Sequence, residues 1–328
     1  METFWNKLSH PILALAPMAD VTDAAYRRLI AQTSMPSVMW TEFVSADGLF
    51  YTREKKGMKD SENPLMRDLL YGEGERPIVA QIFSSKPEMI RYATKLAVTL
   101  GFDGVDINMG CPDRAIERQQ CGAALIKNPA LARTLIEAAK EARIEAGMPS
   151  LGVSVKTRIG YNEESLDTWL PELIAAGPDA ITLHLRTRKE MSKVDAHWDL
   201  MKKAVAIRDG LGSTIPLIGN GDVKSVADAK EKIAESGCDG AMLGRAIFGN
   251  PWLFSERSSD LITKEERLQA LLALATYFEE LSPPKSFHIL RKHVKAFVSG
   301  FDGAAELRAL LMETNCREEM ERILAPEL

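Results

Sequence analysis

The sequence of 328 residues contains only four cysteines, which are scattered along the chain: Cys111, Cys121, Cys238 and Cys316. None forms a CxxC pair, the spacing that many zinc sites and redox-active thiols use. We therefore expect no metal site and no network of disulfides. A reducing, cytoplasmic setting fits this cysteine content best.

The sequence also lacks a long apolar run, since no stretch approaches the roughly 18 residues that span a bilayer. The first residues, METFWNKLSHPILALAP, lack the basic segment, apolar stretch and small-residue cleavage site of a secretory signal. We therefore expect a protein that is neither secreted nor inserted in a membrane. We also expect it to work as a monomer.

An excess of basic residues is missing as well. The chain has 41 lysines and arginines against 46 aspartates and glutamates, a formal net charge of −5. Any contact with a nucleic acid must therefore rest on a local patch. Hydrophobic residues make up 45% and charged residues 27%, a balance that allows a sizeable core.

What the sequence does contain is a repeated alternation of short β-rich runs with helical segments. Eight parallel strands joined by helices are typical of a (β/α)8 TIM barrel, which takes about 250 residues. Thr22 is expected to cap one of the helices, and Asn128 with Pro129 to begin another. The expected strands are Ile12–Ala16, Val38–Phe43, Ile78–Phe83, Val105–Asn108, Val153–Thr157, Ala180–Leu185, Pro216–Gly219 and Gly240–Leu243.

Strand signals stop after Trp252, and from Lys264 onward the sequence is typical of helices. We predict an α/β fold in which a TIM barrel over residues 1–255 is followed by a small C-terminal helical domain over residues 256–328. The alternative is an open, doubly wound sheet. It is disfavoured because no GxGxxG follows the first strand and because the eighth strand falls where a barrel needs it.

Polar side chains end several of the predicted strands, where barrel enzymes carry their chemistry. In VSVKTR, Ser154, Lys156 and Arg158 share one face, which places Lys156 toward the barrel mouth. An ammonium there needs an anionic partner. A neighbouring acid such as Asp106 and an anionic cofactor or phosphate are equally open.

The last three predicted strands end in groups suited to a polar ligand. His184 and Arg186 share one face at the end of the sixth strand. The seventh and eighth strands end in GNGD (219–222) and LGRA (243–246). Glycines there let backbone N–H groups approach a phosphate, and Arg245 adds a charge. A phosphorylated cofactor or substrate is implied.

Cys111 follows Asn108 at the start of a long loop on the catalytic face. A lone cysteine is often only a packing residue, but this position also allows a thiolate nucleophile or a thiol acid. Because no histidine adjoins it in the sequence, proton donation is the better interpretation. Arg114 and Arg118 in the same loop could meet an anionic polymer or simply face solvent.

The segment Lys285–Gly300 reverses the overall charge, with four lysines or arginines, two histidines and no acid. On a helix, His288, Arg291, Lys292 and Lys295 would share one face, while Leu290, Val294 and other apolar residues turn inward. Such a face suits a phosphate backbone, although a solvated surface explains it as well.

Taken together, the motifs resemble those of the tRNA-dihydrouridine synthase family, from about Leu13 to about Arg308. The matching segments are APMADVTD, TEFVSADGL, VAQIFSS, DINMGCP, SVKTRIG, LHLRTR, IGNGDV, GRAIFGNPWLF and KHVKAFVSGFDGAAELR, in family order. The match departs from the family pattern after Cys111, at Leu185 and over 189–199, which leaves the subgroup and the target uridine open.

The resemblance implies an enzyme that binds FMN, takes a hydride from NADPH and reduces the uracil ring of a uridine in tRNA. It implies that Cys111 donates a proton to the uracil. The uridine and tRNA would be held by Asn108, Arg186, Arg291, Lys292 and Lys295. The flavin would be bound by Pro17, Met18, Ala19, Gln81, Lys156, His184, Asn220, Gly221, Asp222, Gly244 and Arg245.

Two rival functions remain open. Another FMN barrel, such as a dihydroorotate dehydrogenase or an ene-reductase, would share the phosphate clamp and the lysine, but would not need the basic helical segment. A tRNA-binding protein without catalysis would not need both Cys111 and Lys156.

Overall fold

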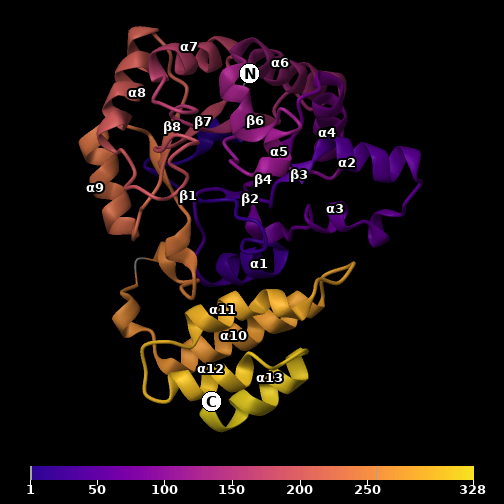
Figure 1. Ribbon diagram of the computed structural model, residues 1–328, viewed down its shortest axis with the longest axis vertical. Coiled ribbons are helices and arrows are strands. Elements are labelled where there is room, and N and C mark those ends of the chain that lie inside the picture. Colours follow the sequence, from indigo (N-terminus) through magenta and orange to yellow (C-terminus); the bar gives the residue numbers. More distant parts are fainter. Residues whose placement is uncertain (1, 256) are drawn as a thin grey trace.

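The computed structural model describes residues 2–255 and 257–328, and its strands form one parallel, closed barrel (Figure 1). The sheet order is β1-β9-β8-β7-β6-β5-β4-β2, and a bridge between Ala14 and Val38 joins its two ends. The TIM-barrel prediction is therefore confirmed. The strands are β1 Ile12–Leu15, β2 Met39–Trp40, β3 Val44–Ser45, β4 Ile78–Phe83, β5 Gly104–Met109, β6 Gly152–Arg158, β7 Ala180–His184, β8 Leu217–Asn220 and β9 Gly240–Leu243.

The second predicted strand, Val38–Phe43, is interrupted. It is replaced by β2 and β3, which both pair with β4. At the break, the hydroxyl of Thr41 accepts the backbone N–H of Gln81 at 3.1 Å. A side chain therefore takes a position that a continuous strand would give to a backbone carbonyl.

Helices surround the barrel in the expected places (Figure 1). Asn128 does cap the helix that begins at Pro129. The predicted cap Thr22 is wrong: Asp23 accepts the N–H of Tyr26, while the Thr22 hydroxyl accepts the N–H of Met18. The barrel helices are α1 Ala24–Thr33, α2 Ala46–Phe50, α3 Pro64–Arg67, α4 Pro87–Thr99, α5 Arg114–Glu117, α6 Pro129–Glu145, α7 Leu166–Ala176, α8 Asp199–Gly210 and α9 Val226–Ser236.

The amino-terminal end of the barrel interior is apolar. Trp5, from a short 3-10 helix at Phe4–Lys7, packs near Trp40, with their ring centroids 5.9 Å apart. A Cβ on Gly152, at the start of β6, would lie 2.9 Å from the Trp5 ring. Because this end is closed by side chains, a ligand has access only from the carboxyl ends of the strands.

From Lys264 onward the chain is helical, as predicted, and these helices form a lobe beside α1 (Figure 1). The lobe is joined to α1 by polar contacts, including Tyr277 to Gln32 at 2.7 Å and Arg28 to Glu280 at 2.5 Å. The predicted domain boundary meets residue 256, which lies outside the described residues, so the division stays a prediction. The helices of the lobe are α10 Lys264–Glu279, α11 Arg291–Phe297, α12 Ala304–Leu311 and α13 Arg317–Leu324. Over 2–255 and 257–328, the helices are all too short or too polar to cross a bilayer.

Candidate functional site

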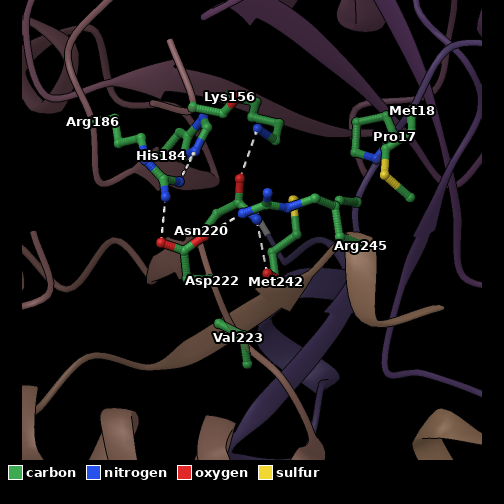
Figure 2. A pocket seen from close by; sticks show the side chains of 14 residues that line it. Pro17, Met18, Lys156, His184, Arg186, Asn220, Asp222, Val223, Met242 and Arg245 are labelled. Carbon is green, nitrogen blue, oxygen red and sulfur yellow. Dashed lines mark hydrogen bonds and ion pairs between the residues drawn. The ribbon is translucent and has the colours of Figure 1, made fainter. Parts of the chain in front are cut away.

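A cavity of about 280 Å³ lies at the carboxyl ends of the strands. It adjoins a wider hollow of about 940 Å³. Figure 2 shows cationic and polar side chains turned toward this cavity, with Pro17 and Met18 across from Arg186. The cavity is lined by Ala16, Pro17, Met18, Lys156, His184, Arg186, Ser192, Asn220, Gly221, Asp222, Val223, Met242, Gly244 and Arg245.

Lys156 lies at the centre of the site, on β6, in register with Asn108 on β5. Its ammonium donates to the Oδ1 of Asn220 at 3.2 Å, and Asn220 in turn donates to the carbonyl of Met242 at 2.8 Å. Burial, and then the nearby charge of Arg158, lower the pKa of Lys156 to about 8. The ammonium is thus held by a neutral amide.

Asp106, the alternative partner for Lys156, is occupied elsewhere. Its carboxylate accepts Ser154 and Gln81, each at 2.7 Å. Within the described parts of the chain, Lys156 forms no ion pair with any carboxylate. An ammonium facing a cavity without a paired carboxylate favours an anionic ligand.

His184 and Arg186 lie side by side on the wall of the cavity (Figure 2). Burial, and then the charges of Lys156, Arg158, Arg186 and Arg245, hold the pKa of His184 well below its ordinary value. The ring is therefore neutral. Because arginine only donates, the contact of 3.2 Å from Arg186 makes His184 Nε2 the acceptor and leaves the proton on Nδ1.

Arg186 is placed differently from the expected RNA contact. Its side chain is 3% exposed and pairs with Asp222. It also donates to the carbonyl of Val194 at 2.7 Å. A guanidinium buried between these partners shapes the wall of the cavity, which favours a role toward the bound ligand over a direct contact with an outer phosphate.

The loops after β8 and β9 form the other end of the site. Gly221 has φ +126°, and a Cβ there would lie 2.7 Å from the Cβ of Ala196, so this position requires glycine. A Cβ on Gly244 would extend toward Met18 across the cavity, at 3.6 Å from its sulfur. Both glycines line the cavity, and Gly221 also allows its loop to approach Ala196 closely.

Asp222 is the acid at this end of the site. Burial disfavours its charge, but hydrogen bonds from Arg186 and the N–H of Ala196 keep its pKa below the ordinary value. It also pairs with Arg245, whose side chain is 66% exposed. Arg245 can therefore turn toward an incoming anion.

Cys111 is half-buried, and its backbone is fixed on both sides. Its N–H donates to Asn108 at 2.9 Å, and its carbonyl accepts the N–H of Ala123 at 2.9 Å. Burial is the main cause that raises the pKa of the thiol, which therefore keeps its proton at neutral pH. The charges of Arg158 and Lys156 act on it in the opposite direction.

Two predicted flavin residues lie outside the lining of the cavity. Ala19 is exposed on the loop that carries Met18, and Gln81 is buried in β4. Four lining residues were missed: Ala16, Ser192, Val223 and Met242. Met242 precedes Gly244 by two positions, so strand alternation could have found it, whereas Ser192 lies in a loop without a sequence signal.

The basic segment is only partly the surface that its sequence indicates. Residues 287–290 form a 3-10 turn and α11 begins at Arg291. Lys295 is exposed, while Arg291 and Lys292 are half-buried. Leu290 and Val294 turn inward as predicted. Lys285 does not belong to the face, since its side chain is 3% exposed and pairs with Glu42 at 2.6 Å.

Comparison with known proteins gives consistent results. A family model described as dihydrouridine synthase (Dus) matches residues 14–327. A probable tRNA-dihydrouridine synthase of Staphylococcus aureus (strain COL) is 36% identical over 326 residues, covering 98% of this chain and 95% of the relative. The probable tRNA-dihydrouridine synthase 2 of Bacillus subtilis (strain 168) is 37% identical over 328 residues, covering 98% and 96%.

Solved structures share the barrel at low sequence identity. Histamine dehydrogenase from Rhizobium sp. 4-9 superposes with a TM-score of 0.55 and 14% identity, over 81% of this chain and 49% of that protein. Morphinone reductase superposes with a TM-score of 0.51 and 12% identity, over 76% and 86%. These likenesses concern the fold alone.

Proposed function

The chain belongs to the dihydrouridine synthase family, and from this we propose that it is a tRNA-dihydrouridine synthase. We propose that it binds FMN and uses NADPH to reduce the C5–C6 double bond of uridines in tRNA. The observation that carries the proposal is the ammonium of Lys156, which lines a cavity shared with Arg186 and Arg245 and has the neutral amide of Asn220 as its hydrogen-bond partner. We further propose that it acts as a cytoplasmic monomer.

The residues at the site fit a flavin mononucleotide. Lys156 offers a positive charge with a neutral amide as its partner, which suits the electron-rich edge of a reduced ring. Gly221, Gly244 and Arg245 offer space and charge for a phosphate. Pro17 and Met18 would line the ring on the side away from His184. When bound, the flavin would supply the hydride that reduces the uracil.

Cys111 is the proposed proton donor. A general acid must hold its proton at the working pH, and burial keeps the thiol protonated. The proton would pass from Sγ to C5 of the uracil as the ring is reduced at C6. His184, held neutral, would orient a polar group of the bound ligand without adding charge.

The proposal also requires that the RNA be held while one nucleotide leaves its stack, which costs a few kcal/mol. Lys295, on the exposed face of α11, and the half-buried Arg291 and Lys292 are proposed to contact tRNA phosphates. We propose that residues 1–255 form the catalytic domain and that residues 256–328 form the RNA-binding domain.

The test compares Cys111→Ala with Cys121→Ala, a matched change in the same loop. We expect purified protein to be yellow, and both variants to keep FMN and its reduction by NADPH. Dihydrouridine formation in tRNA should be lost in Cys111→Ala and kept in Cys121→Ala. A folded, colourless protein that does not take up FMN would refute the flavin proposal, and full activity of Cys111→Ala would remove the thiol from the reaction.

A further inference from the structure

A row of polar side chains crosses the barrel interior directly beneath the site. Gln81 on β4 is in register with Asp106 on β5, and Asp106 is in register with Ser154 on β6. Asn108 stands two residues further along β5, on the same face as Asp106. All four are buried, with at most 7% of each residue exposed.

These side chains form a continuous chain of hydrogen bonds to the Cys111 loop. Gln81 Nε2 donates to Asp106 Oδ2 at 2.7 Å, and Asn108 Nδ2 donates to Gln81 Oε1 at 3.1 Å. Asn108 Oδ1 then accepts two backbone N–H groups, from Gly110 at 3.1 Å and from Cys111 at 2.9 Å. Ser154 donates to the other carboxylate oxygen of Asp106 at 2.7 Å.

The direction of this chain is dictated by its two ends. The Asp106 oxygen accepts the NH₂ group of Gln81, which leaves the Gln81 oxygen to face Asn108. Asn108 must then turn its NH₂ group toward Gln81, which leaves its oxygen facing the loop. The backbone N–H groups of Gly110 and Cys111 only donate, so they require that same oxygen. The acceptor at Asp106 and the N–H donors of the loop therefore require the same orientation of the Gln81 and Asn108 amides.

We propose that Asp106 is a positioning residue for Cys111: acting through Gln81 and Asn108, its carboxylate fixes the amide oxygen that holds the backbone of Gly110 and Cys111. The inference rests on the proposed role of Cys111 as the proton donor. It assigns a purpose to a charged group that touches neither the cavity nor the proposed ligands.

The energetic cost of this arrangement supports a specific role. Burying a polar group costs free energy unless its hydrogen-bond partners are in place, and an apolar side chain of the same size would fill the space without that requirement. Burial raises the pKa of Asp106 to about 6, and the hydrogen bonds from Ser154 and Gln81 counteract the rise. Two further contacts brace the same loop, since Arg158 donates to the carbonyl of Gly110 at 2.8 Å and Thr157 to that of Met109 at 3.0 Å.

The experiment compares two substitutions of similar shape. Asp106→Asn keeps an acceptor oxygen for Gln81 and can donate its amide to Ser154, whereas Asp106→Leu offers no acceptor. Ser154→Ala is the matched control, because it removes the other partner of the carboxylate but lies off the path to Cys111. Asp106→Ala replaces the leucine variant if that protein does not fold.

Two readouts are measured on FMN-loaded protein. The first is the ratio between the rate of flavin reduction by NADPH and the rate of flavin reoxidation by tRNA. The second is the rate at which iodoacetamide labels Cys111, followed by peptide mass spectrometry. In Asp106→Leu we expect reoxidation by tRNA to slow about 100-fold, the effect of a displacement near 1 Å at a reacting group. Reduction by NADPH should be little changed, and Cys111 should be labelled faster.

In Asp106→Asn and Ser154→Ala both readouts should stay close to those of the unaltered protein. Unchanged labelling and unchanged reoxidation in Asp106→Leu and Asp106→Ala would overturn the proposal. So would an asparagine variant as impaired as the leucine variant, since the charge rather than the acceptor would then matter. If Cys111→Ala were fully active, the proposed chemistry would fail, but the labelling rates would still decide whether Asp106 positions the loop.

Discussion

Replacing Lys285 with methionine should destabilise the protein in a strongly pH-dependent way. The Lys285 ammonium lies 2.6 Å from Glu42, 3.5 Å from Asp68, 3.6 Å from Asp20 and 4.0 Å from Asp23. It comes from the C-terminal lobe, while all four carboxylates belong to the barrel region. Lys285→Met keeps most of the side-chain volume but leaves the acids without this counter-charge.

The size of the effect follows from two limits. Removing one partner of a buried ion pair costs about 3–5 kcal/mol. The stranded acid can avoid this cost by taking up a proton. For Glu42, whose ordinary pKa is 4.5, that costs about 4.8 kcal/mol at pH 8 and about 0.7 kcal/mol at pH 5, at about 1.36 kcal/mol per pH unit. We therefore expect a loss of about 3–5 kcal/mol at pH 8 and about 1 kcal/mol at pH 5.

The pKa shifts of the buried acids set the sign of the pH dependence. Burial raises the pKa of Glu42 and of Asp23, and Lys285 counteracts the rise in both. An acid with a raised folded pKa contributes stability that is present at low pH and is lost as the pH rises through the folded pKa. Without Lys285 both pKa values should rise further, so the variant should lose more stability than the unaltered protein between pH 5 and pH 8.

The assay is urea unfolding at both pH values, followed by tryptophan fluorescence and by circular dichroism. The control is the double variant Lys285→Met with Glu42→Gln, which removes the stranded charge and should recover much of the stability lost at pH 8. Equal losses at pH 5 and pH 8, or no recovery in the double variant, would refute this account of the cluster.

Three further predictions concern the ligand site and the RNA. Lys156→Met should reduce the FMN content of purified protein, measured by visible absorbance, because the cavity loses its central positive charge. Gly221→Ala should weaken FMN binding about tenfold or more in a fluorescence titration, since a residue with φ +126° and a Cβ contact of 2.7 Å is strained there. Changing Arg291, Lys292 and Lys295 to glutamine should lower the slope of log affinity for tRNA against log salt by about 2–3, with FMN content unchanged. An unaltered slope would place the RNA elsewhere.

The barrel and much of its site could be predicted because both follow from local patterns. Strand alternation alone predicted that Lys156 faces the barrel mouth. The sequences GNGD and LGRA in the last two loops predicted Gly221 and Gly244 as ligand positions. The interruption near Thr41 could not be predicted in this way. It depends on a hydrogen bond from the backbone of Gln81, which is forty positions away in the sequence.

Lys285 is a clearer example of contacts that the sequence alone could not predict. The residues from 285 to 300 include no acid, so it looked like part of a basic surface. Its partners Glu42, Asp68 and Asp20 are more than 200 positions away and meet it only when the lobe packs on the barrel. The hydrogen-bond chain through Gln81 and Asn108 could not be predicted either, because the orientation of a side-chain amide depends on the tertiary contacts at both of its ends.

The charges around the cavity explain why one ligand class fits the whole site. Burial, and then the charge of Arg158, lower the pKa of Lys156 to about 8, and burial brings the pKa of Arg158 down to about 10. Asp222 offsets only part of this positive charge, because it already serves both Arg186 and Arg245. The site without ligand is therefore electrostatically unfavourable. An anion bound among these groups relieves the repulsion, and by linkage its binding free energy stabilises the folded barrel.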